Sequence, residues 1–145
     1  EHARDRLQKK KLMDPIINDL LHKAALLIEG KAKTKAPVDT GRLRGSIMTA
    51  LEPMKATVAP SVSYGLFVEF GTRPHWPPLA AMQPWARRHG FPPGKSGAFL
   101  VARAISIHGT KPQPYMRPAL KDSLQEIRNM AEKAAQEIQA RWRRG

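Results

Sequence analysis

The chain begins and ends in long stretches whose apolar residues recur every three or four positions. One stretch covers residues 13–28, and the other covers residues 120–142. This spacing places the apolar side chains on one face of a helix, so both ends of the chain are predicted to form long amphipathic helices. The sequence between them has to supply the surface on which these faces pack.

The first of these helices has recognisable ends. Asp14 suits an N-cap, Pro15 suits the first helical position, and the pattern stops near Lys35. We therefore expect a helix over residues 14–35. Residues 1–13, which carry the run of lysines before it, are expected to form a flexible basic arm.

After the first helix the pattern changes from helical to strand-like. Residues 36–45 hold proline, aspartate, threonine and two glycines, which is typical of a loop. Residues 46–51 and 56–62 are short β-compatible runs, separated by a turn at residues 52–55. The sequence therefore predicts a β-hairpin that follows a loop.

Residues 73–110 form a Pro- and Gly-rich insert. A short helix is expected at residues 78–88. Residues 98–107 favour a second helix, although their β-branched content makes a strand the alternative. The predicted architecture is a single α+β domain over residues 1–145: long N- and C-terminal helices packed on a small antiparallel β-sheet, with a Pro-rich helical insert.

Positive charge is the strongest feature of the composition. The 145 residues include 25 basic and 12 acidic ones, a net charge of +13. Residues 41–110 hold eight Lys or Arg against only Glu52 and Glu69. Such an excess indicates an acidic partner, either nucleic acid or an electronegative protein surface.

The sequence lacks the signals of membrane or disulfide-bonded proteins. It has no cysteine, and no apolar run reaches the roughly 18 residues that a membrane helix needs. The first residues contain no apolar segment typical of a signal peptide. We expect no membrane association.

Residues that often carry chemistry are present but poorly arranged for it. His75, His89 and His108 are too far apart for paired helical metal ligands. Gly94-Lys95-Ser96 matches only the end of a phosphate-binding loop, because the required glycine five positions earlier is His89. We therefore expect no catalytic residue, no metal site and no cofactor, and predict that the protein is not an enzyme.

Glu69 is the one carboxylate in an unusual position, inside the apolar run 67–70. It could serve as a catalytic base with a shifted pKa. The alternative, which we favour, is an ion pair with Arg42, Arg44 or Arg73.

Non-specific binding to nucleic acid is the main alternative function. Basic residues of the insert are interleaved with aromatic ones that could stack on bases, although no sequence-reading motif accompanies them. The residues concerned are Arg87, Arg88, Lys95 and Arg103, with Trp76, Trp85 and Phe91.

Three short blocks carry the remaining information: Val38-Asp39-Thr40-Gly41-Arg42-Leu43-Arg44-Gly45-Ser46-Ile47, Tyr64-Gly65-Leu66-Phe67-Val68-Glu69-Phe70-Gly71-Thr72 and Pro112-Gln113-Pro114-Tyr115-Met116-Arg117-Pro118-Ala119-Leu120. The first block contains a turn in which Gly41 can take a positive φ. In an extended chain, Arg42 and Arg44 would point the same way. The prolines of the third block hold Tyr115 and Arg117 in a stiff segment suited to docking.

In this order the blocks resemble the signature of the siphophage tail-completion family, also called head–tail joining or neck proteins, over about residues 20–130. That signature has Pro-Val-Asp-Thr-Gly-Arg-Leu-Arg-x-Ser-Ile, then Tyr-x-x-x-Val-Glu-x-Gly-Thr, then Pro-Gln-Pro-Phe/Tyr-x-Arg-Pro-Ala. The chain departs from it at Tyr115, where Phe is commoner, and in its long insert.

The resemblance implies a structural virion protein that assembles in the host bacterial cytoplasm and forms a ring, six-fold in this family, at the head-proximal end of the tail. Implied partners are further copies of itself, the neighbouring head–tail connector, the tail tube or terminator proteins, and packaged DNA through non-specific contact. Tight lumenal binding would impede DNA exit, which favours a protein neighbour for the basic surface. The interface candidates are Arg42, Arg44, Tyr64, Glu69, Arg73, Tyr115 and Arg117.

Overall fold

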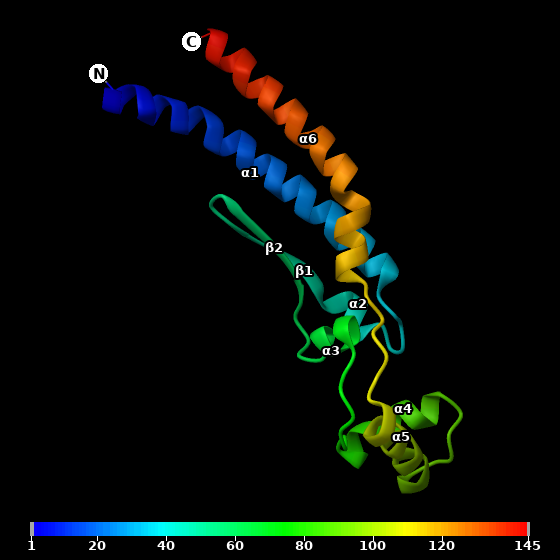
Figure 1. Cartoon of the computed structure of the whole chain (residues 1–145). Helices are drawn as coiled ribbons and strands as arrows, with labels where there is room; N and C mark the ends of the chain where they lie inside the picture. Colours follow the sequence, from blue (N-terminus) through cyan, green and yellow to red (C-terminus); the bar gives the residue numbers. More distant parts are fainter. Residues whose placement is uncertain (1, 145) are drawn as a thin grey trace.

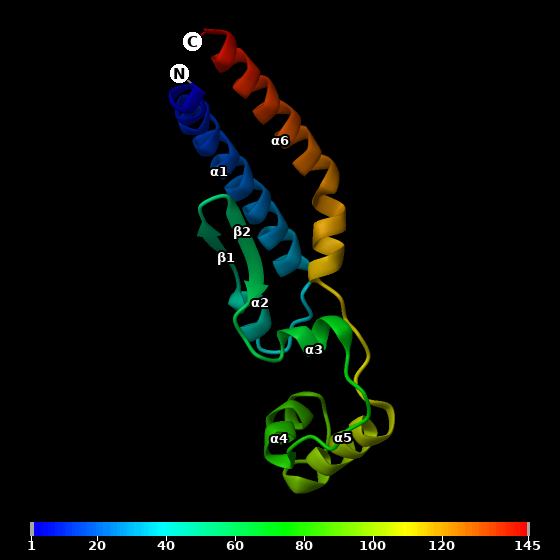
Figure 2. The ribbon, with the colours of Figure 1, turned by 60° about the vertical axis from the view of Figure 1, so that its left-hand side comes forward.

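Two long helices run side by side in opposite directions in the computed structural model, which describes residues 2–144 (Figures 1 and 2). They are α1 (His2–Lys35) and α6 (Met116–Arg144). Lys31 Nζ lies 2.9 Å from Glu126 Oε1 near one end of the pair, and Lys9 Nζ lies 5.0 Å from the Trp142 ring centre near the other. The predicted terminal helices are therefore confirmed.

The expected start of the first helix at Asp14 is wrong. Helix α1 already begins at His2, and Pro15 lies inside it. An interior proline removes one backbone hydrogen bond and costs about 3 kcal/mol. Packing against α6 and the Asp5–Lys9 ion pair, at 2.6 Å, support the first turns. Of the residues expected to form an arm, 2–13 are helical, and residue 1 lies outside the described residues.

The predicted hairpin is confirmed with small shifts at its ends. Strands β1 (Ile47–Glu52) and β2 (Lys55–Pro60) pair antiparallel, with Ile47 opposite Pro60. The hairpin packs on α1, where Thr49 Oγ1 donates a hydrogen bond to Glu29 Oε2 at 2.6 Å. The preceding segment is not entirely loop, because residues Arg42–Ser46 form the short helix α2.

Three further helices complete the fold. Helix α3 (Gly65–Phe70) lies beside the start of α6, whereas α4 (Leu79–Arg88) and α5 (Lys95–His108) form a separate lobe at the far end of the molecule (Figures 1 and 2). The helix predicted at residues 98–107 is confirmed, and the strand alternative is wrong. We refer to residues 73–110 as the lobe.

The hydrophobic core is small for a chain of this length. Its main cluster consists of Ala32, Ala36, Leu43, Ile47, Tyr115 and Ala119. The solvent-accessible surface is 10,481 Å². A compact monomer of 16.2 kDa would expose about 7,500 Å² by the usual size scaling. The chain is therefore elongated and leaves an unusual amount of surface uncovered.

The apolar stripe of α6 illustrates this. The segment forms a helix as predicted, but α1 covers only part of the apolar stripe. Leu120, Leu124 and Trp142 remain exposed, while Ala119 and Ser123 are buried. Within residues 2–144, none of the helices combines the length and apolar content needed to cross a bilayer.

Candidate functional site

The second and third sequence blocks meet at the side chain of Glu69, which is 3% exposed. Its Oε2 accepts hydrogen bonds from the backbone N–H groups of Tyr115, at 2.7 Å, and Met116, at 2.9 Å. Its Oε1 accepts the backbone N–H and the Nε–H of Arg117, both at 3.0 Å. We call this arrangement the Glu69 clamp.

The Glu69 clamp caps the start of α6. The first N–H groups of a helix have no partner inside it and need acceptors from elsewhere. Here the carboxylate of Glu69, on the neighbouring helix α3, supplies these acceptors. The residue after Arg117, Pro118, has no N–H group that needs an acceptor. A negative charge at this helix end is also favoured by the helix dipole.

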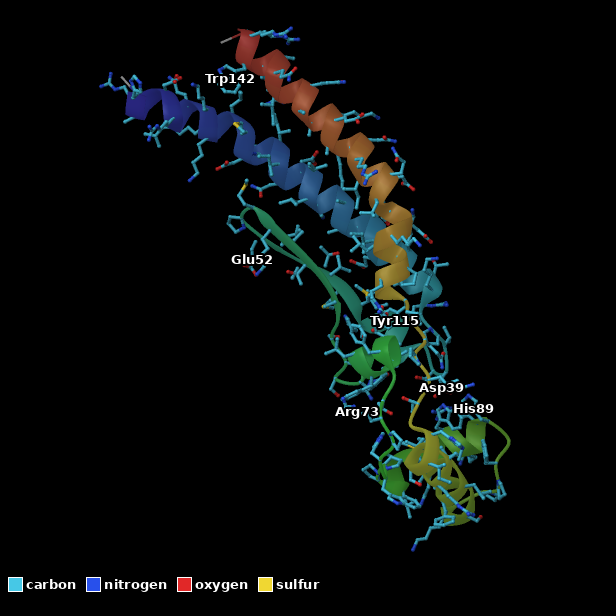
Figure 3. All side chains as sticks on the ribbon, in the orientation of Figure 1. Asp39, Glu52, Arg73, His89, Tyr115 and Trp142 are labelled. Carbon is cyan, nitrogen blue, oxygen red and sulfur yellow. The ribbon has the colours of Figure 1, made fainter. Side chains whose placement is uncertain are left out.

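Two more contacts lock the same blocks together. The Tyr115 hydroxyl donates to the Gly65 carbonyl at 2.9 Å, and the Gln113 N–H donates to the Val68 carbonyl at 2.8 Å. Position 65 has no room for a side chain, since a Cβ there would lie 2.5 Å from Cγ of Pro60. Figure 3 shows Tyr115 at the junction between α3 and α6.

The environment of Glu69 keeps it ionised. Burial alone raises the pKa of its carboxyl, but the three backbone N–H groups and the Arg117 side chain outweigh burial and hold that pKa below its ordinary value. An ionised carboxylate engaged by four donors is a structural anchor. It lacks the features expected of a catalytic base working near neutral pH.

The expected ion pair of Glu69 therefore exists, but with another partner. Arg117, from the third block, takes the position expected for Arg42, Arg44 or Arg73. Arg42 and Arg44 lie exposed on α2, so the expectation that they project in parallel from an extended segment is wrong.

Gly71 and Thr72 lie where the chain enters the lobe, and both contact the segment by which it leaves. Gly71 has a φ of 72°, and a Cβ there would lie 2.5 Å from the carbonyl oxygen of Thr110. Thr72 and Thr110 form an isolated antiparallel bridge, and their hydroxyls lie 2.9 Å apart. The two chain segments entering and leaving the lobe are thus held together.

The first block contacts the lobe through Asp39. Arg88 Nε donates to Asp39 Oδ1 at 2.9 Å, and the second guanidinium nitrogen reaches Oδ2. Thr40 makes the expected turn contact, accepting the N–H of Arg42 at 3.4 Å, and Gly41 takes the expected positive φ of 83°. Asp39 Oδ1 also lies 4.0 Å from His89 Nε2, and Figure 3 labels the two residues close together at this contact.

The seven interface candidates divide into two groups. Glu69 and Tyr115 are buried, where they join α3 to α6. The others are exposed around this junction and at the base of the lobe: Arg42, Arg44, Tyr64, Arg73 and Arg117. The Arg117 guanidinium lies over the Phe70 ring, at 4.7 Å from its centre.

Sequence reasoning missed the exposure of α3. Leu66, Phe67 and Phe70 are 57–65% exposed. We call these three residues the α3 patch. Their apolar character suggested that they would be buried. The one signal in the sequence is Glu69 in the same run, because a helix that buries this carboxylate has to turn its apolar side chains towards solvent.

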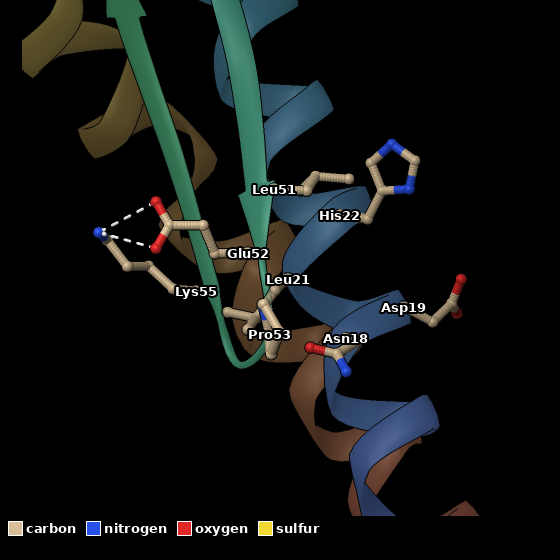
Figure 4. Close-up of a pocket in the computed structure, with 8 residues that line it drawn as sticks. All are labelled: Asn18, Asp19, Leu21, His22, Leu51, Glu52, Pro53 and Lys55. Carbon is tan, nitrogen blue, oxygen red and sulfur yellow. Dashed lines mark hydrogen bonds and ion pairs between the residues drawn. The ribbon is translucent and has the colours of Figure 1, made fainter.

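The described residues contain little that resembles an active site. An open depression lies between the hairpin turn and α1, where Glu52 pairs with Lys55, while His22 and Asp19 point away from them (Figure 4). No group of three or more potential metal ligands occurs within residues 2–144.

Comparison with known proteins gives one match. A family model described as "Bacteriophage HK97-gp10, putative tail-component" matches residues 4–71. This span contains α1 from residue 4 onward, the first block, the hairpin and α3, whereas the lobe and α6 lie outside it. No curated protein and no solved structure matches the chain. The resemblance to a phage tail family, predicted from the three blocks, is confirmed.

Proposed function

Residues 4–71 match the model of the HK97-gp10-like family of bacteriophage tail components, and from that premise we propose that the chain is a tail component that joins the tail to the head of the virion. In this proposal the chain acts as a single domain, assembles in the host bacterial cytoplasm and forms a six-fold ring at the head-proximal end of the tail. Its role is structural and requires no cofactor.

The observation that carries the proposal is the uncovered surface. The chain exposes about 3,000 Å² more than a compact protein of its mass. Permanent assemblies bury about 2,000–5,000 Å² at their interfaces. The excess exposed surface is accounted for if neighbouring subunits cover it in an assembly.

The α3 patch is the proposed centre of the ring contact. Its three large apolar side chains are exposed, the Arg117 guanidinium lies over the Phe70 ring, and Tyr64 immediately precedes the helix. Aromatic residues and arginine are enriched at interface centres. A closed ring needs two different surfaces per subunit, and Arg42 and Arg44 on α2, with Arg73, are proposed to lie on the second.

The Glu69 clamp supports this proposal indirectly. It fixes α3 to α6 with hydrogen bonds at 2.7–3.0 Å, so that the α3 patch is presented on a rigid base. A rigid surface loses little entropy when it docks. The proposed neighbours along the tail axis are the head–tail connector and the tail tube or terminator proteins.

The ring is tested by sedimentation and negative-stain electron microscopy of the purified chain. We expect a closed oligomer, which the double variant Leu66→Glu/Phe67→Glu converts to a folded monomer. Leu26→Glu, at a half-exposed position on α1, is the matched control and should still assemble. A wild-type chain that stays monomeric at high micromolar concentration would contradict the ring.

The position in the virion is tested in particles that lack this protein. Detached full heads and finished tails are the expected products. Normal virions would refute the assignment.

Non-specific nucleic-acid binding is the second candidate, because residues 73–110 hold five basic and no acidic residues. Tight binding of duplex DNA by an isolated monomer, with a steep dependence on salt, would favour it over the joining role.

A further inference from the structure

Helix α5 buries its small residues and exposes its large apolar ones, which is the reverse of an ordinary amphipathic helix. Its small residues are buried against the rest of the lobe: Gly97, Ala98, Val101 and Ala102. Its large apolar residues point outward, with Phe99, Leu100 and Ile107 each 46–54% exposed. These three residues and Arg103 are spaced by one, three or four positions and share one side of the helix, which we call the α5 face.

Trp76 extends the α5 face at one edge. It is 59% exposed, and its ring lies 5.9 Å from that of Phe99. The neighbouring residue His75 donates its N–H to the carbonyl of Ile105 at 3.3 Å. The segment that carries Trp76 is therefore held on α5, and the aromatic pair is a fixed part of the surface.

The charged residues of the lobe that carries this face are all basic. Arg73, Arg87, Arg88, Lys95 and Arg103 lie in residues 73–110, and no aspartate or glutamate does. Within residues 2–144, Arg88 is the only one of these five that forms an ion pair, and its partner is Asp39 from outside the lobe. A partner that covers the face has to bring negative charge to its rim.

We propose that the α5 face docks a different protein that presents an apolar surface surrounded by acidic residues. A second copy docked through the same lobe is disfavoured, because residues 73–110 carry five basic residues and no acidic one, so two such surfaces would repel each other. Nucleic acid would satisfy the arginines, but it would leave Leu100 and Ile107 without apolar contacts. This inference rests on the proposed function, in which the chain has neighbours in the virion, and it names the chemistry of one of them.

The probe is a synthetic amphipathic helical peptide of about 20 residues, long enough to be helical, with leucine on one face and glutamate on the others. A peptide of the same composition, with the leucines spread around the helix, is the control ligand. Fluorescence anisotropy of the labelled peptides measures their binding to the full-length protein.

We expect the amphipathic peptide to bind and the control peptide to bind at least about tenfold more weakly. Phe99→Ala/Ile107→Ala should weaken binding about tenfold, and Arg103→Glu should weaken it and reduce its salt dependence. Leu26→Ala, on α1, should change nothing. All four substituted residues are exposed, so these variants are expected to fold, and circular dichroism verifies this.

Two results would overturn the inference in favour of another occupant. The first is measured with a labelled DNA duplex of about 30 base pairs. The face would be assigned to DNA if this duplex binds more tightly than the peptide, and if Arg103→Glu weakens its binding while Phe99→Ala/Ile107→Ala does not. Loss of self-assembly in Phe99→Ala/Ile107→Ala would assign it to a second copy.

Absence of peptide binding by the wild-type chain, or equal binding of the two peptides, would also refute the inference. Sedimentation of the same samples keeps the two proposals apart. A wild-type chain that binds the peptide but does not form rings would refute the ring and leave the α5 face in place.

Discussion

Oε1 of Glu69 accepts two hydrogen bonds from Arg117, one from its backbone N–H and one from its Nε, each at 3.0 Å. The two residues are 48 positions apart in the sequence. The whole lobe lies between them, so the contact joins the two ends of a long excursion of the chain. The first prediction concerns this contact.

Glu69→Gln should lower the free energy of unfolding by about 2–3 kcal/mol, because one oxygen that accepts N–H groups becomes an NH₂ donor facing them. Urea denaturation measures the change. Glu52→Gln is the control, because Glu52 is an exposed partner of Lys55 and should shift stability by less than about 0.5 kcal/mol. Equal effects of the two substitutions would argue against the Glu69 clamp.

Acid should weaken the same contact. The pKa of Glu69 is lower in the folded chain than its ordinary value of about 4.3, so its contribution is complete above that value and is lost as pH falls through the folded pKa. Unfolding free energy measured from pH 6 down to pH 3 should fall less steeply in Glu69→Gln than in the wild type. Parallel curves would contradict this.

Tyr115→Phe should cost about 1 kcal/mol, because the Gly65 carbonyl loses its donor inside the protein. Thermal unfolding followed by circular dichroism measures this cost. Tyr64→Phe, at an exposed position, is the control and should be close to neutral. A neutral Tyr115→Phe would mean that the hydroxyl contributes nothing.

Gly71→Ala should destabilise the chain by about 2 kcal/mol or more, because φ is positive and the new Cβ would meet the Thr110 carbonyl. Gly30→Ala is the matched control with the opposite sign. It lies inside α1 with nothing within 4 Å of the new Cβ, so it should stabilise the chain by about 0.5–1 kcal/mol. Chemical denaturation of both variants checks the difference in sign.

Asp39→Asn should loosen the lobe without unfolding the rest of the chain, because it removes the charge that Arg88 binds. Hydrogen exchange should become faster in α4, while exchange in α1 and α6 stays unchanged. Asp19→Asn, which breaks only the exposed pair with Lys23, should leave α4 exchange as it is in the wild type. Unaltered exchange in Asp39→Asn would show that the pair does not restrain the lobe.

The sequence by itself determined the elements that depend on local periodicity and turn chemistry. The terminal helices, the hairpin, the two lobe helices and the positive φ of Gly41 all follow from spacing and residue type. It also indicated the resemblance to a phage tail family, whose model matches residues 4–71 and so includes the first two of the three blocks. The start of α1 was misjudged because Pro15 is a strong local stop signal that helix–helix packing overrides.

Only the tertiary structure decided what the blocks do. Which arginine pairs with Glu69 depends on which segments meet across 48 residues, and no local rule specifies that. The exposure of the apolar faces of α3 and α5 could not be predicted from the sequence either. Apolar spacing shows that a helix has an apolar face, but not whether another part of the same chain covers that face. Glu69 itself was recognised from its position, but its role as the cap of α6 follows from the fold alone.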